Sequence, residues 1–196
     1  MNPTHFFAMM SRMKYIERWA LMRNSVKENI SEHSLEVAML GHGLAVLAKV
    51  RFHREDVIPE RVALMALYHD CTEIITGDMP TPIKYDNADI QEAYKQIEMM
   101  ASYRLLNMLP GDMREYYEEL FVGKEEDAAM WHLVKAADRL SALIKCIEEE
   151  KAGNREFASA KETIEASIHN MQCPEAELFM EEFLPAYYKN LDELSR

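Results

Sequence analysis

Hydrophobic residues recur through most of the chain at the three-to-four-residue spacing of amphipathic helices. The first such stripe comprises Leu35, Ala38, Met39, His42, Ala45 and Val46. Either Ser31 or Asn29 could cap the start of this helix, because both residue types accept hydrogen bonds from free backbone N–H groups. A second stripe begins at Pro59, a residue favoured in the first helical turn, and continues through His69. The pattern therefore predicts two consecutive helices in this part of the chain.

The rest of the sequence favours helix as well. Further helices are predicted over residues 90–108, 128–150 and 157–171, and a last one after Pro174. Pro110-Gly111 is interpreted as the end of the first of these. Gly77, Pro80 and Pro82 interrupt the pattern and predict a stiff loop, because proline fixes φ and restricts the residue before it. No convincing run alternates between polar and apolar residues as a strand would. We therefore expect an all-α fold, with residues 1–196 forming a single-domain helical bundle.

Charge narrows the range of partners. The 196 residues include 22 basic and 34 acidic ones, which gives a formal net charge of −12. Sequence-independent binding of DNA or RNA requires a basic face, so we expect no nucleic acid polymer as a partner. Any phosphate that this protein binds must meet a local cluster of positive charge.

Cysteine spacing and hydropathy suggest where the protein works. The three cysteines, Cys71, Cys146 and Cys173, form no C-x-x-C pair, which is typical of reduced thiols in the cytoplasm. The longest early uncharged run covers residues 37–48, which is shorter than the roughly 20 residues needed to span a bilayer. The N-terminal residues do not resemble a secretory signal. We therefore expect a cytoplasmic protein with no membrane partner.

Candidate chemistry begins with an adjacent histidine and aspartate, His69 and Asp70, placed within the second predicted helix. Neighbouring helical positions point about 100° apart, so an imidazole and a carboxylate there can converge on one ion. Glu73 lies four residues after His69 and is expected on the same face. His33 lies in the first turn of the preceding helix, and Asp138 lies in the helix predicted over 128–150.

Asp138 shares its predicted helical face with apolar or neutral residues. A bare carboxylate buried there would be costly or would lose its charge, whereas a metal ion or a well-placed arginine removes the penalty. Together with His33, His69 and Asp70 it offers two nitrogen and two oxygen ligands. That set suits Mn, Co, Fe, Ni or Zn better than the all-oxygen preference of Mg or Ca.

Simpler explanations exist for the same residues. His69 could be a core histidine that bonds a neighbouring carbonyl, and Asp70 could pair with Arg61 or Arg139. His42 lies on the apolar stripe, about 180° from His33, and is interpreted as a core or partner contact.

Several motifs of the chain together match one family. They are Glu17-Arg18-Trp19, Ser31-Glu32-His33-Ser34-Leu35, Tyr68-His69-Asp70, Glu73, the run from Thr76 to Tyr85 and Lys135-Ala136-Ala137-Asp138. A histidine, a distant His-Asp pair and a further aspartate resemble the HD-domain metal-dependent phosphohydrolases. The full set resembles, more narrowly, the bacterial 5′-deoxynucleotidases of YfbR type. This resemblance covers essentially the whole chain, and Cys71-Thr72 departs from the pattern only at positions that are not presumed ligands.

The resemblance implies a helical bundle of the HD-domain phosphohydrolase type that forms a homodimer. It implies hydrolysis of deoxyribonucleoside 5′-monophosphates to deoxynucleoside and phosphate, with one cobalt or manganese ion. The residues that it implies as metal ligands are His33, His69, Asp70 and Asp138. The substrate-binding residues that it implies are Arg18, Trp19, His33, Asp70, Asp78, Met79, Pro80, Thr81 and Asp138.

The resemblance also implies individual roles. Arg18 would orient the phosphate, Trp19 would crowd the sugar, Asp78 would bind the 3′-hydroxyl, and Glu73 would assist the attacking water. Lys84 is a possible second cation for the phosphate. Two alternatives stay open: an HD-type hydrolase of nucleoside triphosphates or cyclic nucleotides, and a non-catalytic helical module in which the ion is only a structural staple.

Overall fold

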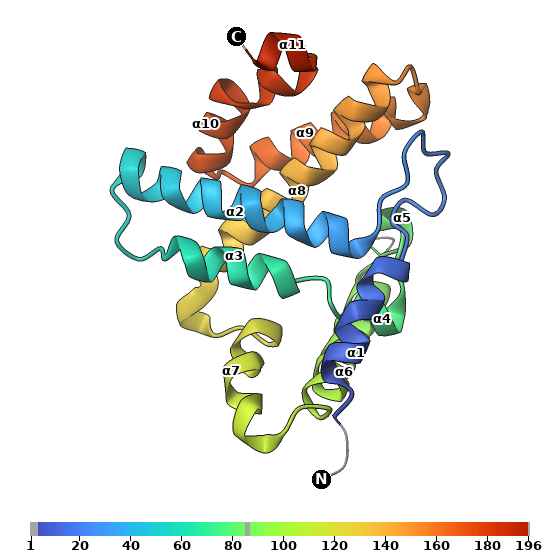
Figure 1. The fold of residues 1–196 in the computed structure, drawn as a ribbon, viewed down its shortest axis with the longest axis vertical. Helices are drawn as coiled ribbons and strands as arrows, with labels where there is room; N and C mark the ends of the chain where they lie inside the picture. The colour runs from blue at the N-terminus through green and yellow to red at the C-terminus, as the bar shows by residue number, and fades with distance from the viewer. Residues whose placement is uncertain (1–3, 85–86, 196) are drawn as a thin grey trace.

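A computed structural model describes residues 4–84 and 87–195 of the chain (Figure 1). In these two ranges the regular secondary structure is entirely helical, and strand-like pairing is limited to one isolated antiparallel bridge between Glu17 and Asn29. The predicted all-α class is therefore confirmed.

The bounds of the elements are as follows. The longer helices are α2 (Ile30–Phe52), α3 (Pro59–Tyr68), α6 (Ala88–Leu106), α7 (Gly111–Phe121), α8 (Ala128–Lys151), α9 (Ala158–Asn170) and α10 (Pro174–Glu182). The short α-helices are α1 (Phe6–Met10), α4 (Glu73–Thr76), α5 (Thr81–Lys84) and α11 (Leu191–Leu194). Four 3₁₀ turns complete the set: η1 (Ser11–Tyr15), η2 (Glu125–Asp127), η3 (Arg155–Phe157) and η4 (Leu184–Tyr188).

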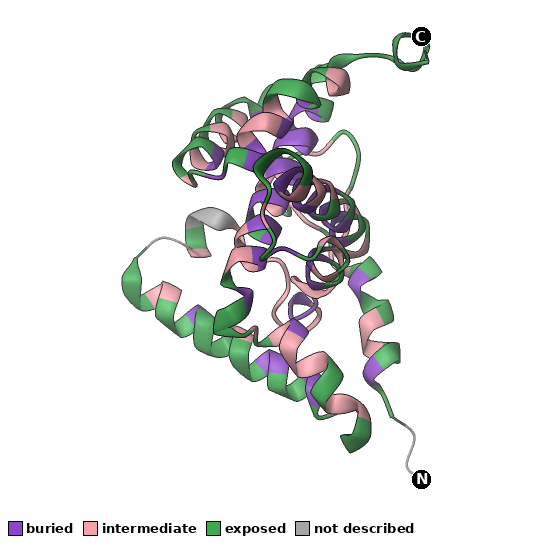
Figure 2. Cartoon of the chain, turned by 90° about the vertical axis from the view of Figure 1, so that its left-hand side faces the viewer, coloured by how far each residue is buried: buried purple, intermediate pink, exposed green. Residues whose placement is uncertain are grey.

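Helices α2, α3 and α8 form the centre of the molecule, and buried residues concentrate there (Figure 2). The three helices pack closely around Gly41. A Cβ atom at this position would lie 3.3 Å from Val62 Cγ1 and 3.6 Å from the Cβ atoms of Ala66 and Ala137. Small residues on all three helices thus let the backbones approach one another, which fixes the relative positions of the helices that carry the predicted ligands.

The start of α2 is fixed by a reciprocal pair of hydrogen bonds. The Asn29 side chain accepts from the backbone N–H groups of Ser31 and Glu32, and the Glu32 carboxylate accepts from the Asn29 N–H. Such a capping box satisfies backbone donors that the helix itself cannot. Asn29, rather than Ser31, is therefore the N-cap, and His33 comes in the first turn as predicted.

A second apolar cluster lies below the central helices in Figure 1 and joins α1, η1 and α6 to the start of α2. Its buried members are Phe6, Met13, Ile30, Cys71, Leu105, Leu106 and Leu109.

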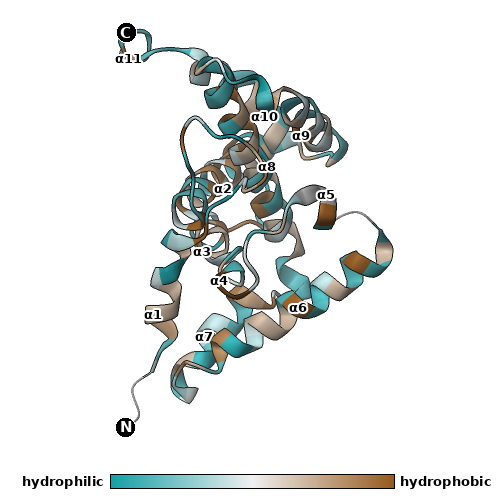
Figure 3. Ribbon diagram, turned by 90° about the vertical axis from the view of Figure 1, so that its right-hand side faces the viewer, coloured by the Kyte–Doolittle hydropathy of each residue, from teal (hydrophilic) through white to brown (hydrophobic). Residues whose placement is uncertain are grey.

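Hydrophilic positions are interspersed along the long helices (Figure 3). In the described part of the chain, no helix combines the length and the apolarity needed to cross a bilayer.

The structure corrects several expectations. Ala38 and Ala45 of the predicted α2 stripe are buried, whereas Leu35, Met39 and His42 are exposed, so the stripe coincides with the buried face only in part. Because α3, α8 and α10 surround α2, a broad face is buried, and apolar residues remain on the outside. His42 is therefore not a core residue.

Helices α1 and α7 have no counterpart among the predicted elements, and neither do the short helices α4, α5 and α11. Helix α5 begins at Thr81, within the run around Pro80 and Pro82 that we predicted as a loop. Helix α7 follows Pro110 and begins at Gly111, a pair that we interpreted only as the end of the preceding helix.

We predict opposite effects on stability for the two glycines of α2. Gly41→Leu should lower the free energy of unfolding by about 1–3 kcal/mol, because the added atoms meet α3 and α8. Gly43→Ala, where a Cβ atom meets nothing within 4 Å, should raise it by about 0.5–1 kcal/mol through helix propensity. Urea unfolding followed by circular dichroism measures both, and equal effects of the two changes would contradict the close approach at Gly41.

Candidate metal centre

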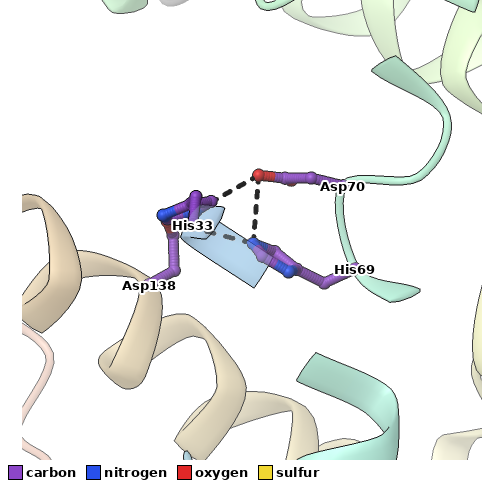
Figure 4. Close-up of side chains that lie close together, drawn as sticks. All are labelled: His33, His69, Asp70 and Asp138. Atoms are coloured by element: carbon purple, nitrogen blue, oxygen red, sulfur yellow. Dashed lines mark ion pairs between the residues drawn. The ribbon is translucent and has the colours of Figure 1, made fainter. Parts of the chain in front are cut away.

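Four side chains from three separate segments converge at one point (Figure 4). His33 comes from the first turn of α2, His69 and Asp70 follow α3, and Asp138 comes from the middle of α8. One potential ligand atom from each lies within 4.8 Å of all the others. The structure thus brings together the four residues that we interpreted as metal ligands.

The nitrogen and oxygen atoms face one another across short distances. His33 Nε2 lies 3.1 Å from Asp138 Oδ1 and 3.4 Å from Asp70 Oδ2. His69 Nε2 lies 3.1 Å from the same Asp70 oxygen and 4.0 Å from Asp138 Oδ1. Asp138 is 40% exposed at its side chain, so it is not the deeply buried carboxylate that the helical pattern suggested.

His69 and Asp70 reach the cluster by a different route from the one predicted. Helix α3 ends at Tyr68, and the chain turns through hydrogen bonds from Cys71 N–H to the Tyr68 carbonyl and from Glu73 N–H to the Asp70 carbonyl. The pair therefore converges because of a turn, and Glu73 begins the separate helix α4. The expectation that Glu73 shares a helical face with His69 is wrong.

The imidazole of His69 is oriented by its other nitrogen. Nδ1–H donates to the carbonyl oxygen of Ala66 at 2.7 Å, which leaves the lone pair of Nε2 directed at the carboxylates. The simpler explanation, a histidine bonded to a neighbouring carbonyl, is thus correct for Nδ1 but leaves Nε2 to be explained. This is the arrangement by which metal-binding histidines are usually held.

A chain of two polar side chains orients His33 in the same way. Its Nδ1 lies 3.1 Å from Ser141 Oγ, and the Ser141 hydroxyl donates to Glu36 Oε2 at 2.6 Å. Arg18 Nη1 also lies 2.8 Å from Nδ1, so Nδ1 can accept from Arg18 or donate to Ser141. Only donation to Ser141 leaves a lone pair on Nε2 for an ion.

Two imidazole nitrogen atoms without hydrogen bonds to any described residue bear on whether a metal ion fits between these side chains. Nε2 of His33 and Nε2 of His69 are both buried and make no hydrogen bond to any described residue, although carboxylate oxygens lie within 4 Å. Buried polar atoms without partners are rare in proteins. A cation bound between the two imidazoles and the two carboxylates would satisfy all of them, so the donor set fits a divalent transition metal.

The charges of the cluster reinforce this fit. Partial burial alone would raise the pKa of Asp70, but the adjacent imidazoles of His69 and His33 hold it well below its usual range. Burial likewise opposes a charge on His69, yet Asp70 and Asp138 raise the pKa of its imidazole to about 9. The carboxylates thus stay negative and attract a positive charge, whether a proton or a metal ion, to the space between them.

Arg18 and Trp19 border the cluster from the loop before α2. Arg18 Nη2 lies 3.9 Å from Asp138 Oδ1, while Nη1 donates to Glu28 Oε2 at 3.0 Å. The Trp19 indole N–H donates to the same Glu28 oxygen at 2.9 Å. Glu28 was not among the residues that we predicted for the site, because its contacts depend on a loop closure that helical periodicity does not indicate.

Glu73 and Asp78 come from the segment after α3. Glu73 is buried and its Oε2 has no hydrogen-bond partner in the described residues. Burial and the nearby carboxylates of Asp70 and Asp78 raise its pKa to about 9. Asp78 accepts a hydrogen bond from the Trp19 backbone N–H at 3.2 Å, and burial raises its pKa too.

The remaining predicted residues are tied less directly to the cluster. Met79 and Pro80 are partly buried in the loop after Asp78, and the side chain of Thr81 lies outside the described part of the structure. Lys84 pairs with Glu98 at 2.9 Å, so a phosphate would have to compete for it.

The proposed alternative partners of Asp70 are occupied elsewhere. Arg61 binds Asp127 and Glu119, and Arg139 donates to the Ser167 carbonyl. A simple ion pair of Asp70 with either arginine is therefore not what the structure contains.

A cavity of about 470 Å³ adjoins His69 and Thr72 and continues between α6, the end of α7 and the face of α8 that carries Lys135.

Comparison with known proteins identifies the family. A family model described as 5′-deoxynucleotidase YfbR-like matches residues 5–187. A 5′-deoxynucleotidase of Erwinia tasmaniensis is 48% identical over 196 residues, covering 100% of this chain and 98% of the relative. A 5′-deoxynucleotidase of Vibrio cholerae is 45% identical over 195 residues and covers 100% of both chains.

Solved structures share the fold at lower sequence identity. An HD-domain phosphohydrolase from Listeria innocua has a TM-score of 0.80 at 21% identity, covering 97% of this chain and 92% of its own. The cyanophage S-2L HD phosphohydrolase, solved with dA and one catalytic Zn²⁺, has a TM-score of 0.63 at 19% identity and covers 89% and 93%. With the matched family model and the close relatives, these findings show that the chain belongs to the YfbR-like family of 5′-deoxynucleotidases.

Proposed function

We propose that this protein is a metal-dependent 5′-nucleotidase that hydrolyses deoxyribonucleoside 5′-monophosphates to deoxynucleoside and phosphate. The observation that carries the proposal is the cluster of His33, His69, Asp70 and Asp138, whose two buried Nε2 atoms make no hydrogen bond within the described part of the chain. Family membership over residues 5–187 supports the substrate class. Both relatives described above are named 5′-deoxynucleotidases.

Those four residues would hold one divalent ion, for which we favour cobalt or manganese. Zinc is the ion in the related cyanophage structure, and the same donor set accommodates it. A bound divalent ion neutralises phosphate charge and can lower the pKa of water from 15.7 to about 7.

The residues around the cluster supply binding and proton transfer. Arg18 would bind a phosphate oxygen through Nη2, the nitrogen that faces Asp138 while Nη1 is held by Glu28. Asp78 would accept a hydrogen bond from the 3′-hydroxyl, and Trp19 would occupy the space beside C2′. Both lie on the Arg18 side of the cluster, joined by the hydrogen bond from Trp19 N–H to Asp78.

Glu73 would act as the acid–base group. Its raised pKa means that it carries a proton at neutral pH in the absence of a bound ion. A nearby positive charge would lower that pKa, so that Oε2 could take a proton from the attacking water and later return it to the leaving 5′-oxygen. Met79, Pro80 and Thr81 would line the sugar side of the pocket.

We further propose a cytoplasmic homodimer that binds neither a membrane nor a nucleic acid polymer. The net charge of −12 supports the absence of nucleic acid binding. Light scattering at several protein concentrations measures the oligomeric state directly.

Substrate class and metal dependence are tested together. Chelated protein should release no phosphate, and added Co²⁺ or Mn²⁺ should restore release from deoxyribonucleoside 5′-monophosphates more strongly than from the matching ribonucleotides. Phosphate release is measured across mono-, tri- and cyclic nucleotides. Hydrolysis confined to triphosphates or cyclic nucleotides would favour the other HD-type activity, and a bound ion without any hydrolysis would favour the structural staple.

Glu73→Gln should lower kcat by about 10²–10⁴-fold, because the amide cannot exchange a proton with water or the leaving group. The metal content, measured by elemental analysis, should stay near that of the wild type. Glu115→Gln, at an exposed position of α7, is the matched control and should leave kcat unchanged. Normal turnover of Glu73→Gln would contradict the acid–base role.

Arg18→Ala should reduce kcat/KM by about 10–100-fold, as expected for the loss of a charge-assisted hydrogen bond to phosphate. Metal content should again be retained, since Arg18 is not a ligand. Arg12→Ala removes an exposed arginine of the same segment and serves as the control. Wild-type kinetics of Arg18→Ala would refute its role in phosphate binding.

A further inference from the structure

The side chain of Glu28 joins two residues of the proposed substrate site through one oxygen atom. Oε2 accepts from Arg18 Nη1 at 3.0 Å and from Trp19 Nε1 at 2.9 Å. Its other oxygen, Oε1, lies 3.7 Å from His33 Nδ1. Only 12% of the Glu28 side chain is exposed, and the Arg18 side chain is equally protected. The contact is therefore a shielded one, in which a charged hydrogen bond is stronger than at the surface.

The backbone places Glu28 opposite Arg18. The isolated bridge pairs Glu17 with Asn29, and the Arg18 N–H donates to the Glu28 carbonyl at 2.9 Å. Residues 18–28 thus form a closed loop whose two ends are paired, immediately before the Asn29 cap of α2. Both partners of the side-chain contact come from these paired ends, so its geometry is set by the chain itself.

Trp19 needs such support, because its backbone is in the left-handed region with φ of 60°. Bulky residues persist there only when their surroundings hold them. Besides the bond to Glu28, its N–H donates to Asp78 and its ring packs edge-on against Phe157 at a centroid distance of 5.3 Å. The indole is thereby fixed in orientation as well as in position.

The tip of the loop is anchored by a separate set of contacts. The buried Glu149 carboxylate accepts from the backbone N–H groups of Ser25 and Val26, and Lys145 donates to the Val26 carbonyl. Asn154 donates to the Arg23 carbonyl. These contacts to α8 and the turn after it do not involve the Glu28 side chain, so the loop stays attached when that side chain is changed.

We propose that Glu28 is a positioning residue for substrate selection, holding Arg18 and Trp19 in a fixed relation to each other and to the metal cluster. The inference rests on the proposed function, in which Arg18 binds phosphate and Trp19 crowds the position of a 2′-hydroxyl. Glu28 occupies Arg18 Nη1, so Nη2 faces Asp138. The same oxygen stops rotation of the indole. Loss of the carboxylate loosens both residues together.

Glu28→Ala and the nearly isosteric Glu28→Gln test this coupling. Glu28→Ala should raise KM for deoxyribonucleoside monophosphates about 10-fold and reduce the deoxy-over-ribo ratio of kcat/KM about 10-fold, the usual size of one lost charged hydrogen bond. Glu28→Gln should lie between this variant and the wild type, because its amide oxygen can still accept these N–H groups but carries no charge. Calorimetric affinity for Mn²⁺ should change much less than KM, because Glu28 is not a proposed ligand and its Oε1 lies 3.7 Å from His33 Nδ1, beyond hydrogen-bond distance.

A second measurement reports Trp19 without substrate. In a Trp131→Phe background Trp19 is the one remaining tryptophan of the sequence, so emission and acrylamide quenching describe its surroundings alone. Glu28→Ala in that background should shift emission to longer wavelength and increase quenching. Glu17→Gln, which removes a carboxylate from the exposed pair with Lys27 in the same bridge, is the matched control and should change neither fluorescence nor the ratio.

Unchanged quenching and an unchanged deoxy-over-ribo ratio in Glu28→Ala would overturn the proposal. Equal effects of Glu17→Gln and Glu28→Ala would overturn it as well, since they would indicate general loosening of the loop. If the wild type releases no phosphate from any deoxyribonucleotide with any metal, the proposed function fails. Fluorescence then still decides whether Glu28 holds Trp19.

Discussion

The mutual approach of two imidazoles and two carboxylates is the interaction on which the rest of the structure depends. Like charges and buried polar atoms are costly to gather, so the fold must force the four side chains together. It does so by packing α2 against α3 and α8 at Gly41, where no larger residue fits without displacement. The hydrophobic core thus determines the distances within a polar cluster that would be unfavourable without a cation.

The residues around this cluster divide into a rigid part and a loop-borne part. His33 and Asp138 lie within long helices of the core, and His69 and Asp70 follow α3 in a hydrogen-bonded turn. Arg18 and Trp19 instead come from a loop that reaches the cluster through Glu28 and Asp78. The proposed metal ligands and the proposed substrate-selecting residues are therefore held by different contacts, so one set could be altered without the other.

Sequence patterns predicted most of the helices because a 3.6-residue period is a local property that survives in almost any context. They missed α7, since Pro110-Gly111 is as typical of a helix end as of a start. They also gave the buried face of α2 only in part, because a helix surrounded on several sides has no single apolar stripe. Family motifs indicated the four clustered residues, but Glu28 was missed because its role depends on contacts between paired loop ends. Ser141, which contacts His33 Nδ1, could have been predicted from the helical period, because it lies three residues after Asp138 on α8.

Asp70 and Glu73 are only three residues apart, yet their pKa values shift in opposite directions. Asp70 faces two imidazoles, which offset its burial and hold its pKa well below the usual range. Glu73 starts a new helix, and its burial together with the carboxylates of Asp70 and Asp78 raises its pKa to about 9, in spite of the opposing charges of Arg18 and Lys84. Had α3 continued through residue 73, Glu73 would have shared the face of His69 and gained an imidazole partner. The turn after Tyr68 therefore separates an anionic carboxylate, which we propose as a metal ligand, from a protonated acid. Pairs of carboxyl groups kept apart in this way are suited to divided roles in hydrolysis.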